Sequence, residues 1–176
     1  MPKYRKMLND INAPYIRSLM RLIDTQSKTT LANWCIDYSE RVIVPIYEKH
    51  CPGDSRPQSA LNAAREWLCG NIKLPEVKKI ILNGCHAAAR ELDANPTAQA
   101  AARTCGQVSS CVHAPKHSLG LALYGALAVA YDKLGIDAGW DALLLAAAEE
   151  CVNMEAALRA VAAENEPNPA KIKWNC

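Results

Sequence analysis

Hydrophobic residues recur at helical spacing along most of the chain. Between Asp137 and about Ala163 they follow one another at steps of 3, 1, 3, 4, 3, 4 and 3, and these positions are Trp140, Leu143, Leu144, Ala147, Cys151, Met154, Leu158 and Val161. A second stripe has steps of 3, 1, 3, 4 and 4, and consists of Leu31, Trp34, Cys35, Tyr38, Val42 and Ile46. Steps of three and four place side chains on one face of an α-helix, so both segments are predicted to be amphipathic helices.

Proline and glycine mark the boundaries of the predicted helices, because proline is favoured in the first helical turn and glycine just past the last one. On this pattern helices begin near Pro14, Thr29 or Thr30, Pro57, Pro75, Pro96, Pro115 and Asp137. Gly70 and Gly135 follow the ends of two of them. Pro45 lies inside the second segment, where it removes a backbone donor, so we expect it to kink that helix or end it early.

The helix predicted from Pro75 to near Leu92 has a distinct polar face. Its apolar positions lie within roughly 100° of one another on a helical wheel. The opposite face carries Lys79, Asn83, His86 and Arg90.

Short connections between these segments favour antiparallel neighbours. We therefore predict an all-α fold, a compact bundle or array of about six to seven antiparallel helices. Residues 1–164 are predicted to form a single helical domain, since no linker richer than the 51–56 loop divides them. Residues 165–176 have no helical period and are predicted to form an irregular C-terminal tail that packs loosely, with Ile172 and Trp174 as its anchors.

The composition agrees with closely packed helices. The chain has 29 alanines and no phenylalanine, so its core must be built from Leu, Ile, Val, Ala and Cys. A net charge of +2 with 22% charged residues disfavours disorder and polybasic binding of nucleic acid. No stretch approaches about 18 consecutive apolar residues, so we expect no membrane span. The N-terminal segment lacks the apolar core of a secretion signal, so we expect a cytoplasmic protein.

Eight cysteines occur, and no pair has C-x-x-C spacing. In the cytoplasm they are expected to be mostly buried thiols rather than disulfides. Cys111, His113 and His117 form the alternative metal-binding set, because thiolates and imidazoles are natural ligands of zinc and copper. Pro115 separates the two histidines and the spacing matches no recognised site, so we expect no metal and no other cofactor.

Seven polar residues stand out in the alanine-rich central region, and we take them as candidate partner-binding or ligand-binding residues: Arg56, Arg65, His86, Arg90, Arg103, His113 and His117. Arginine is favoured where bidentate recognition or interface anchoring is needed. The alternative explanation is interhelical salt bridges with Glu66, Glu91 and Asp93, or simple exposure to water. No catalytic residue is assigned, because the motifs of hydrolases, zinc proteases, phosphate-binding loops and dinucleotide-binding folds are all missing.

Three stretches of the central region carry a family resemblance: RPQSALNAAREWLCG at 56–70, CHAAARELDANPTAQAAARTCG at 85–106 and VHAPKHSLGLALYGALAV at 112–129. In their order and spacing, residues 56–131 resemble the immunity proteins of bacterial polymorphic toxin systems. The seven polar candidates all match motif positions of that family. This sequence departs from the family pattern in having cysteines at 69, 85, 105 and 111.

The resemblance implies a small all-helical cytoplasmic protein that binds and neutralises a cognate protein toxin without catalysing a reaction. The partner is then a toxin, with no nucleic acid and no membrane, and self-association into a homo-oligomer stays open. The alternative is a small-molecule or metal-binding helical protein, with an enzyme included, that uses the histidine, arginine and cysteine cluster.

Overall fold

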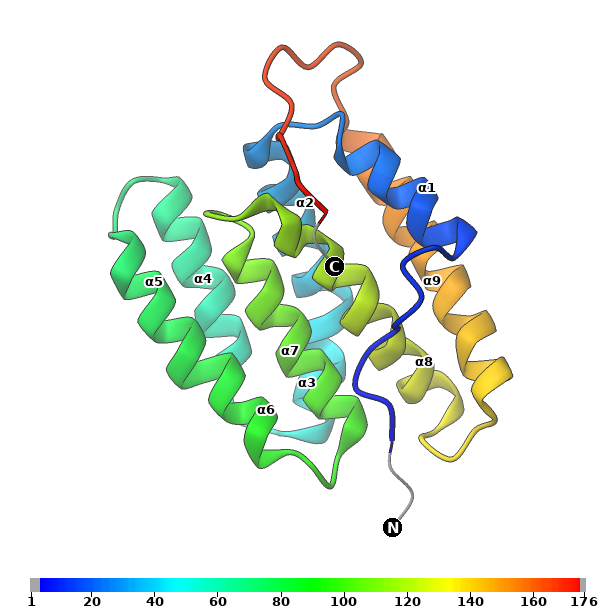
Figure 1. The fold of residues 1–176 in the computed structure, drawn as a ribbon. Coiled ribbons are helices and arrows are strands. Elements are labelled where there is room, and N and C mark those ends of the chain that lie inside the picture. The colour runs from blue at the N-terminus through cyan, green and yellow to red at the C-terminus, as the bar shows by residue number, and fades with distance from the viewer. Residues whose placement is uncertain (1–3, 175–176) are drawn as a thin grey trace.

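The computed structural model describes residues 4–174, and its architecture is all-helical (Figure 1). Its α-helices are α1 (Pro14–Ile23), α2 (Lys28–Tyr38), α3 (Val44–His50), α4 (Arg56–Leu68), α5 (Leu74–Ile81), α6 (Ala87–Glu91), α7 (Pro96–Ser110), α8 (Ala126–Leu134) and α9 (Trp140–Val161). Three π-helical segments, η1 (Ser39–Ile43), η2 (Leu82–His86) and η4 (Leu121–Gly125), and one 3-10 segment, η3 (Pro115–Ser118), complete the described helices.

The π-helical segments join several of these elements end to end. Segment η1 links α2 to α3, η2 links α5 to α6, and η4 runs directly into α8. The described chain therefore forms seven helical rods and no β-strand, which confirms the predicted fold class. No helix within residues 4–174 is both long enough and apolar enough to cross a bilayer.

Most helix boundaries follow the proline and glycine pattern. Asn95 caps α7 by accepting a hydrogen bond from the Ala98 N–H at 3.1 Å, and Gly135 ends α8 with a φ of +83°, a conformation that favours glycine. The cap of α2 was predicted wrongly. It is Ser27, whose hydroxyl oxygen accepts from the Thr30 N–H at 3.1 Å, and helix α2 begins at Lys28.

Pro45 does not end its helix early, and the distortion expected there takes the form of a π-helical segment directly before it. The preceding five residues form η1, in which the Val44 N–H donates to the Ser39 carbonyl, and Pro45 then lies in the first turn of α3. A π-helical turn inserts one extra residue and shifts the hydrogen-bond register, so a continuous helical rod can hold a proline that lacks a backbone donor. The run from Val42 to Tyr47 is therefore helical despite its β-branched residues.

Helix α7 lies at the centre of the array, in contact with α2, α3, α4, α5, α6 and α8 (Figure 1). The rod that consists of α5, η2 and α6 runs antiparallel to it. The Gln99 side chain donates to the Ala89 carbonyl at one end of this pairing, and Gly106 lies against Cys85 and His86 at the other. On another side, Gly120 lies against Gln107 and Gly125 against Thr104, so the rod that ends in α8 is antiparallel to α7 as well.

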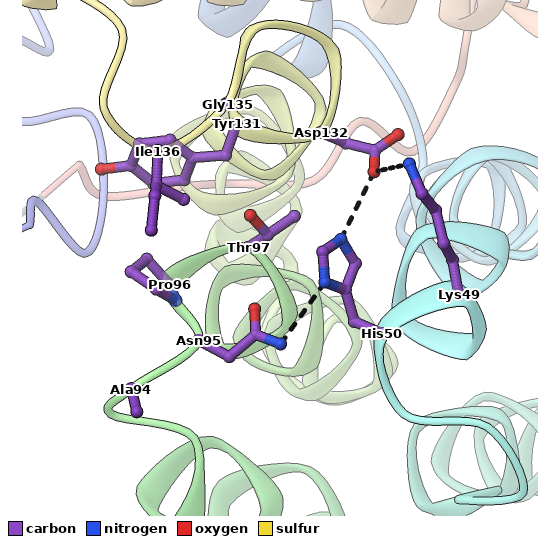
Figure 2. Close-up of a pocket in the computed structure, with 10 residues that line it drawn as sticks. All are labelled: Lys49, His50, Ala94, Asn95, Pro96, Thr97, Tyr131, Asp132, Gly135 and Ile136. Atoms are coloured by element: carbon purple, nitrogen blue, oxygen red, sulfur yellow. Dashed lines mark hydrogen bonds and ion pairs between the residues drawn. The ribbon is translucent and has the colours of Figure 1, made fainter.

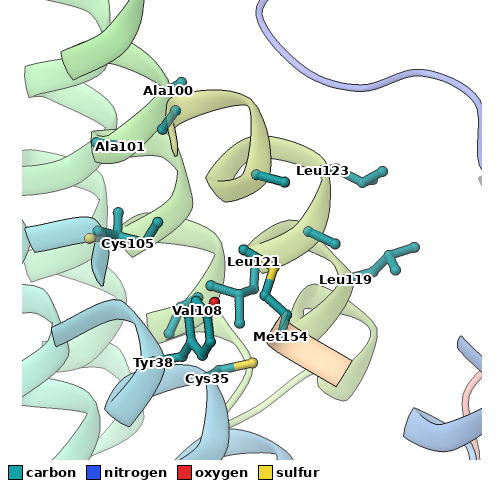
Figure 3. Packing of buried hydrophobic residues seen from close by; sticks show 14 of the residues in the cluster. Cys35, Tyr38, Ala100, Ala101, Cys105, Val108, Leu119, Leu121, Leu123 and Met154 are labelled. Carbon is teal, nitrogen blue, oxygen red and sulfur yellow. The ribbon is translucent and has the colours of Figure 1, made fainter. Parts of the chain in front are cut away.

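The core is built mainly from aliphatic, alanine and cysteine side chains, with a few buried aromatic residues. Figure 3 shows Val108 of α7 among Cys35, Tyr38, Leu121 and Met154, which come from α2, η4 and α9. Of the cysteines within residues 4–174, Cys35, Cys85, Cys105, Cys111 and Cys151 are buried thiols, Cys51 is half-buried and Cys69 is exposed. This confirms that most are core thiols, whereas Cys176 lies outside the described residues.

Residues 165–174 contain no helix, and several of their groups contact the rest of the protein. The Ala170 N–H donates to the Gln26 carbonyl at 2.7 Å, and the Ala163 N–H donates to the Gln26 side chain at 2.8 Å. Ala170 is buried, and Trp174 donates its indole N–H to Asp24 at 2.9 Å. Gln26 and Ala170 therefore hold the tail against the turn between α1 and α2, together with the predicted anchor Trp174.

The close approach at Gly120 gives a test of this packing. A Cβ atom at position 120 would lie 2.4 Å from the Gln107 Cβ, a distance that requires a helix to move. We expect Gly120→Ala to lower the free energy of unfolding by about 1–3 kcal/mol, measured by urea denaturation. Gly139→Ala is the control, because a Cβ at that position meets nothing within 4 Å. Equal stability of the two variants would contradict this packing.

Candidate functional site

Two of the seven candidate residues are held in ion pairs. Arg56 Nη2 lies 2.7 Å from Asp54 Oδ2 and 2.8 Å from Glu91 Oε2, which ties the start of α4 to α6. The Arg56 guanidinium, together with the Tyr47 hydroxyl that donates to Asp54 at 2.7 Å, lowers the pKa of Asp54 to about 2. Arg56 therefore has a structural role that its neighbours fully explain.

Arg65 is paired in the same manner. Its Nη2 lies 2.6 Å from Asp37 Oδ1 and 2.6 Å from Glu40 Oε2, and its Nε donates to Glu40 Oε1 at 3.2 Å. Hydrogen bonding to these carboxylates raises the pKa of Arg65. Arg65 therefore ties α4 to the rod of α2 and η1. Interhelical salt bridges explain both arginines, although Arg65 uses Asp37 and Glu40 and not Glu66.

The other five candidates lie along one side of α7: the three histidines are beside its C-terminal half, Arg103 is on α7 itself, and Arg90 follows His86 on the neighbouring rod, where its charge acts on that ring. The His86 ring lies against Gly106, where a Cβ would be 3.1 Å from His86 Cε1. The rings of His113 and His117 have centroids 6.1 Å apart, and His117 Nδ1 lies 2.7 Å from Gln107 Oε1, to which the ring N–H donates. Together with two neighbouring lysines they form what we call the basic face: Lys78, His86, Arg90, Arg103, His113, Lys116 and His117.

Positive groups surround each histidine of the basic face. Burial first and then the charges of Arg103 and Arg90 lower the pKa of His86. Burial and the charge of Lys78 lower the pKa of His113. Burial, followed by the influence of His113, Lys116 and His86, lowers the pKa of His117. Each histidine is therefore biased towards its neutral form.

The cations of the basic face have no carboxylate partner. Within residues 4–174, none of its four lysines and arginines lies within 4.0 Å of a carboxylate oxygen. Two of its buried atoms, Arg103 Nε and His113 Nδ1, have no hydrogen-bond partner among the described residues. Buried polar atoms are normally paired, so these two nitrogens lack the hydrogen-bond partners that are usual for buried groups.

The metal-binding alternative finds no support in the geometry. Cys111 is fully buried, and its thiol faces the Pro115 carbonyl at 3.9 Å and the neighbouring Cys35. Among residues 4–174 no three His, Cys, Asp or Glu side chains are arranged to hold a metal ion. Cys111 therefore points into the core, whereas His113 and His117 belong to the partly exposed basic face.

A cavity of about 420 Å³ lies at the other end of α7 (Figure 2). One ion pair lies in it, with Lys49 Nζ 2.8 Å from Asp132 Oδ1. His50 Nε2 lies 3.4 Å from the same oxygen, and Asn95 donates to His50 Nδ1 at 3.4 Å. No candidate residue lines it. The small-molecule pocket that the alternative interpretation placed around the candidate histidines therefore does not coincide with this cavity.

A comparison of the sequence with models of protein families shows the family of the chain. The family model described as Imm-5 like putative immunity protein matches residues 21–157. The chain belongs to this family. No curated protein and no solved structure shows a significant match to this chain.

The family match confirms the resemblance and extends it. The immunity protein family covers not only residues 56–131 but also the chain from the last turns of α1 to late in α9. The whole basic face lies within the matched region. The family assignment supports an immunity-type role in general, and it names no binding residue.

Sequence reasoning missed three members of this surface. Lys78 and Lys116 belong to the basic face, and Gln107 fixes the His117 ring. The signal for Gln107 is its place four residues after Arg103 on an alanine-rich helix, since side chains four apart share a face. Lys78 lies eight residues before His86, and the π-helical segment η2 begins between them. A helical wheel drawn for a regular α-helix therefore places Lys78 away from the face that contains His86.

Arg65 and Arg90 give a matched test of structural against free arginines. We expect Arg65→Ala to lower the free energy of unfolding by about 1–2 kcal/mol, because Asp37 and Glu40 lose their partner on a half-exposed surface. Arg90 is exposed and unpaired within the described chain, so Arg90→Ala should change stability by less than about 0.5 kcal/mol. Urea denaturation of both variants measures this, and a larger loss for Arg90→Ala would make Arg90 structural.

The lowered histidine pKa values predict a pH dependence of stability. The unfolded chain has histidine pKa values of about 6.5, whereas those of His86, His113 and His117 are lower in the folded protein. The unfolded state then binds more protons as the pH falls, so their contribution is complete above about pH 6.5 and is lost as the pH falls through the folded values.

We therefore expect Tm to fall between about pH 7.5 and 5.5, above the range in which most carboxylates titrate. The double variant His86→Gln/His117→Gln should show a smaller fall, measured by differential scanning calorimetry. Lys79→Gln, which changes an exposed residue of α5 outside the basic face, should keep the wild-type slope. An identical slope in the double variant would show that these histidines do not contribute.

Proposed function

We propose that this protein is an immunity protein that binds a cognate bacterial toxin in the cytoplasm and neutralises it by occupying its surface. The observation that carries the proposal is the family match over residues 21–157. The toxin need not be modified for this role. A stable complex of this kind buries at least about 1,200 Å², an area that the exposed helices of one side of the array can supply.

The surroundings of the basic face support binding without catalysis. Its histidines lie beside lysines and arginines that disfavour their protonated form. The nearest thiol on the same rod, Cys85, is buried, and burial raises its pKa to about 12. A thiol in that environment stays protonated and is a poor nucleophile.

Co-expression with the toxin encoded beside this protein tests the proposal. We expect the immunity protein to restore growth of cells that make the toxin, and to elute with it as one complex. A non-cognate toxin is the control and should not be neutralised. A cognate toxin that neither binds the protein nor loses its toxicity would contradict the proposal.

Titration of the purified toxin separates binding from catalysis. Neutralisation should reach its plateau at an equimolar ratio, because each bound molecule protects against one toxin molecule. Full neutralisation at a ratio far below equimolar would instead reveal turnover and favour an enzyme. Homo-oligomerisation stays a prediction, and the elution volume of the free protein checks it.

A further inference from the structure

The basic face gathers four cations that make no ion pair within residues 4–174, and one of them, Arg103, has a buried Nε without a hydrogen-bond partner there. Some cations elsewhere are paired across elements, as in Lys6 with Asp93 at 3.1 Å and Lys49 with Asp132 at 2.8 Å, and others, such as Arg17, are simply exposed. The two carboxylates nearest to the basic face are already engaged, Glu91 by Arg56 and Asp93 by Gln99 and Lys6. The charges of the basic face are therefore left for carboxylates that another molecule brings.

An exposed leucine lies within the same surface. Leu82 of η2 has 55% of its side chain exposed, and it stands four residues after Lys78 and four before His86 on one rod. An exposed apolar side chain beside polar and charged ones is typical of a protein interface, where apolar and arginine anchors carry most of the binding energy. A free inorganic anion would make no use of Leu82.

The basic face is also held in place before any partner arrives. The His86 ring packs on Gly106, and Gln107 orients the His117 ring. Arg103 projects from α7, the most enclosed helix of the array. Side chains fixed in this way lose little conformational entropy on binding, which favours tight association.

We infer that the basic face is the toxin-binding surface, and that it takes an acidic segment of the toxin whose carboxylates pair with Arg90 and Arg103 while an apolar residue packs on Leu82. This inference rests on the proposed function and adds to it the contact surface and the chemistry of the partner. Arg56 and Arg65, whose guanidinium groups are paired within the protein, are not part of this surface.

Charge reversal on purified complexes tests the inference. Arg90→Glu, at an exposed and unpaired position, should weaken toxin binding at least about 30-fold, measured as Kd by calorimetry. Leu82→Ser should weaken it by about tenfold. Arg17→Glu is the matched control, since Arg17 is an exposed arginine of α1, on the far side of α7 from α5 and α6 (Figure 1), and it should leave Kd within about threefold.

Arg103→Glu and a compensating change in the toxin complete the test. Arg103 is half-buried, so the Kd of Arg103→Glu is interpreted only if the Tm of this variant stays near that of the wild type. If the Tm falls, Arg90→Glu alone decides the test. A toxin in which one interface carboxylate is changed to lysine should bind Arg90→Glu better than it binds the wild type. Raising the salt concentration from about 0.05 to 0.5 M should weaken the wild-type complex.

The outcomes distinguish the proposed function from the proposed contact surface. Wild-type protein that neutralises the toxin, with Arg90→Glu and Leu82→Ser binding equally well, would overturn the basic face and leave the proposed function intact. Wild-type protein that neither binds nor neutralises the toxin would overturn both. Displacement of the toxin by millimolar inorganic phosphate, with no effect of Leu82→Ser, would identify a general anion site and would also overturn the inference.

Discussion

Small side chains on α7 let the neighbouring rods come into direct contact with its backbone. Ala100, Ala101 and Ala102 are buried, and Gly106 offers a surface on which the Cys85 and His86 side chains lie. Each alanine buries little area, so the stability of the array depends on many close contacts rather than on a few large side chains. The central helix is therefore fixed on all sides, and side chains that leave it, such as Arg103, start from a rigid position.

The three π-helical segments follow from the same close packing. Segments η1, η2 and η4 all contact α7. A π-helical turn adds one residue and rotates all later side chains around the helix axis. In η2 this rotation brings His86 against Gly106, whereas Lys79 and Asn83 remain exposed. The packing of the core and the placement of a candidate binding residue are thus set by one local distortion.

Local signals predicted the number and order of the helices, because periodicity and the positions of proline and glycine act within a few residues. They could not choose Ser27 over Thr29 or Thr30 as the cap of α2, since serine and threonine both cap helices well. They also could not separate Arg56 from Arg90. Both are arginines near the ends of alanine-rich helices, and only the folded chain brings Glu91 within 2.8 Å of Arg56, whereas Arg90 makes no ion pair within residues 4–174. Residue types suggested the seven candidates, and the ion pairs of the folded chain separated Arg56 and Arg65 from the other five.

The basic face costs the free protein stability, because unpaired cations repel one another and two buried nitrogens lack partners. Such a cost is expected where a surface is shaped for another molecule, as in binding sites that pair fully only in the complex. The neighbouring histidines reduce the repulsion by staying neutral. Carboxylates that approach Arg90 and Arg103 would raise the histidine pKa values again, so the surface gains positive charge as an acidic partner binds. The same side chains then limit repulsion in the free protein and strengthen attraction in the complex.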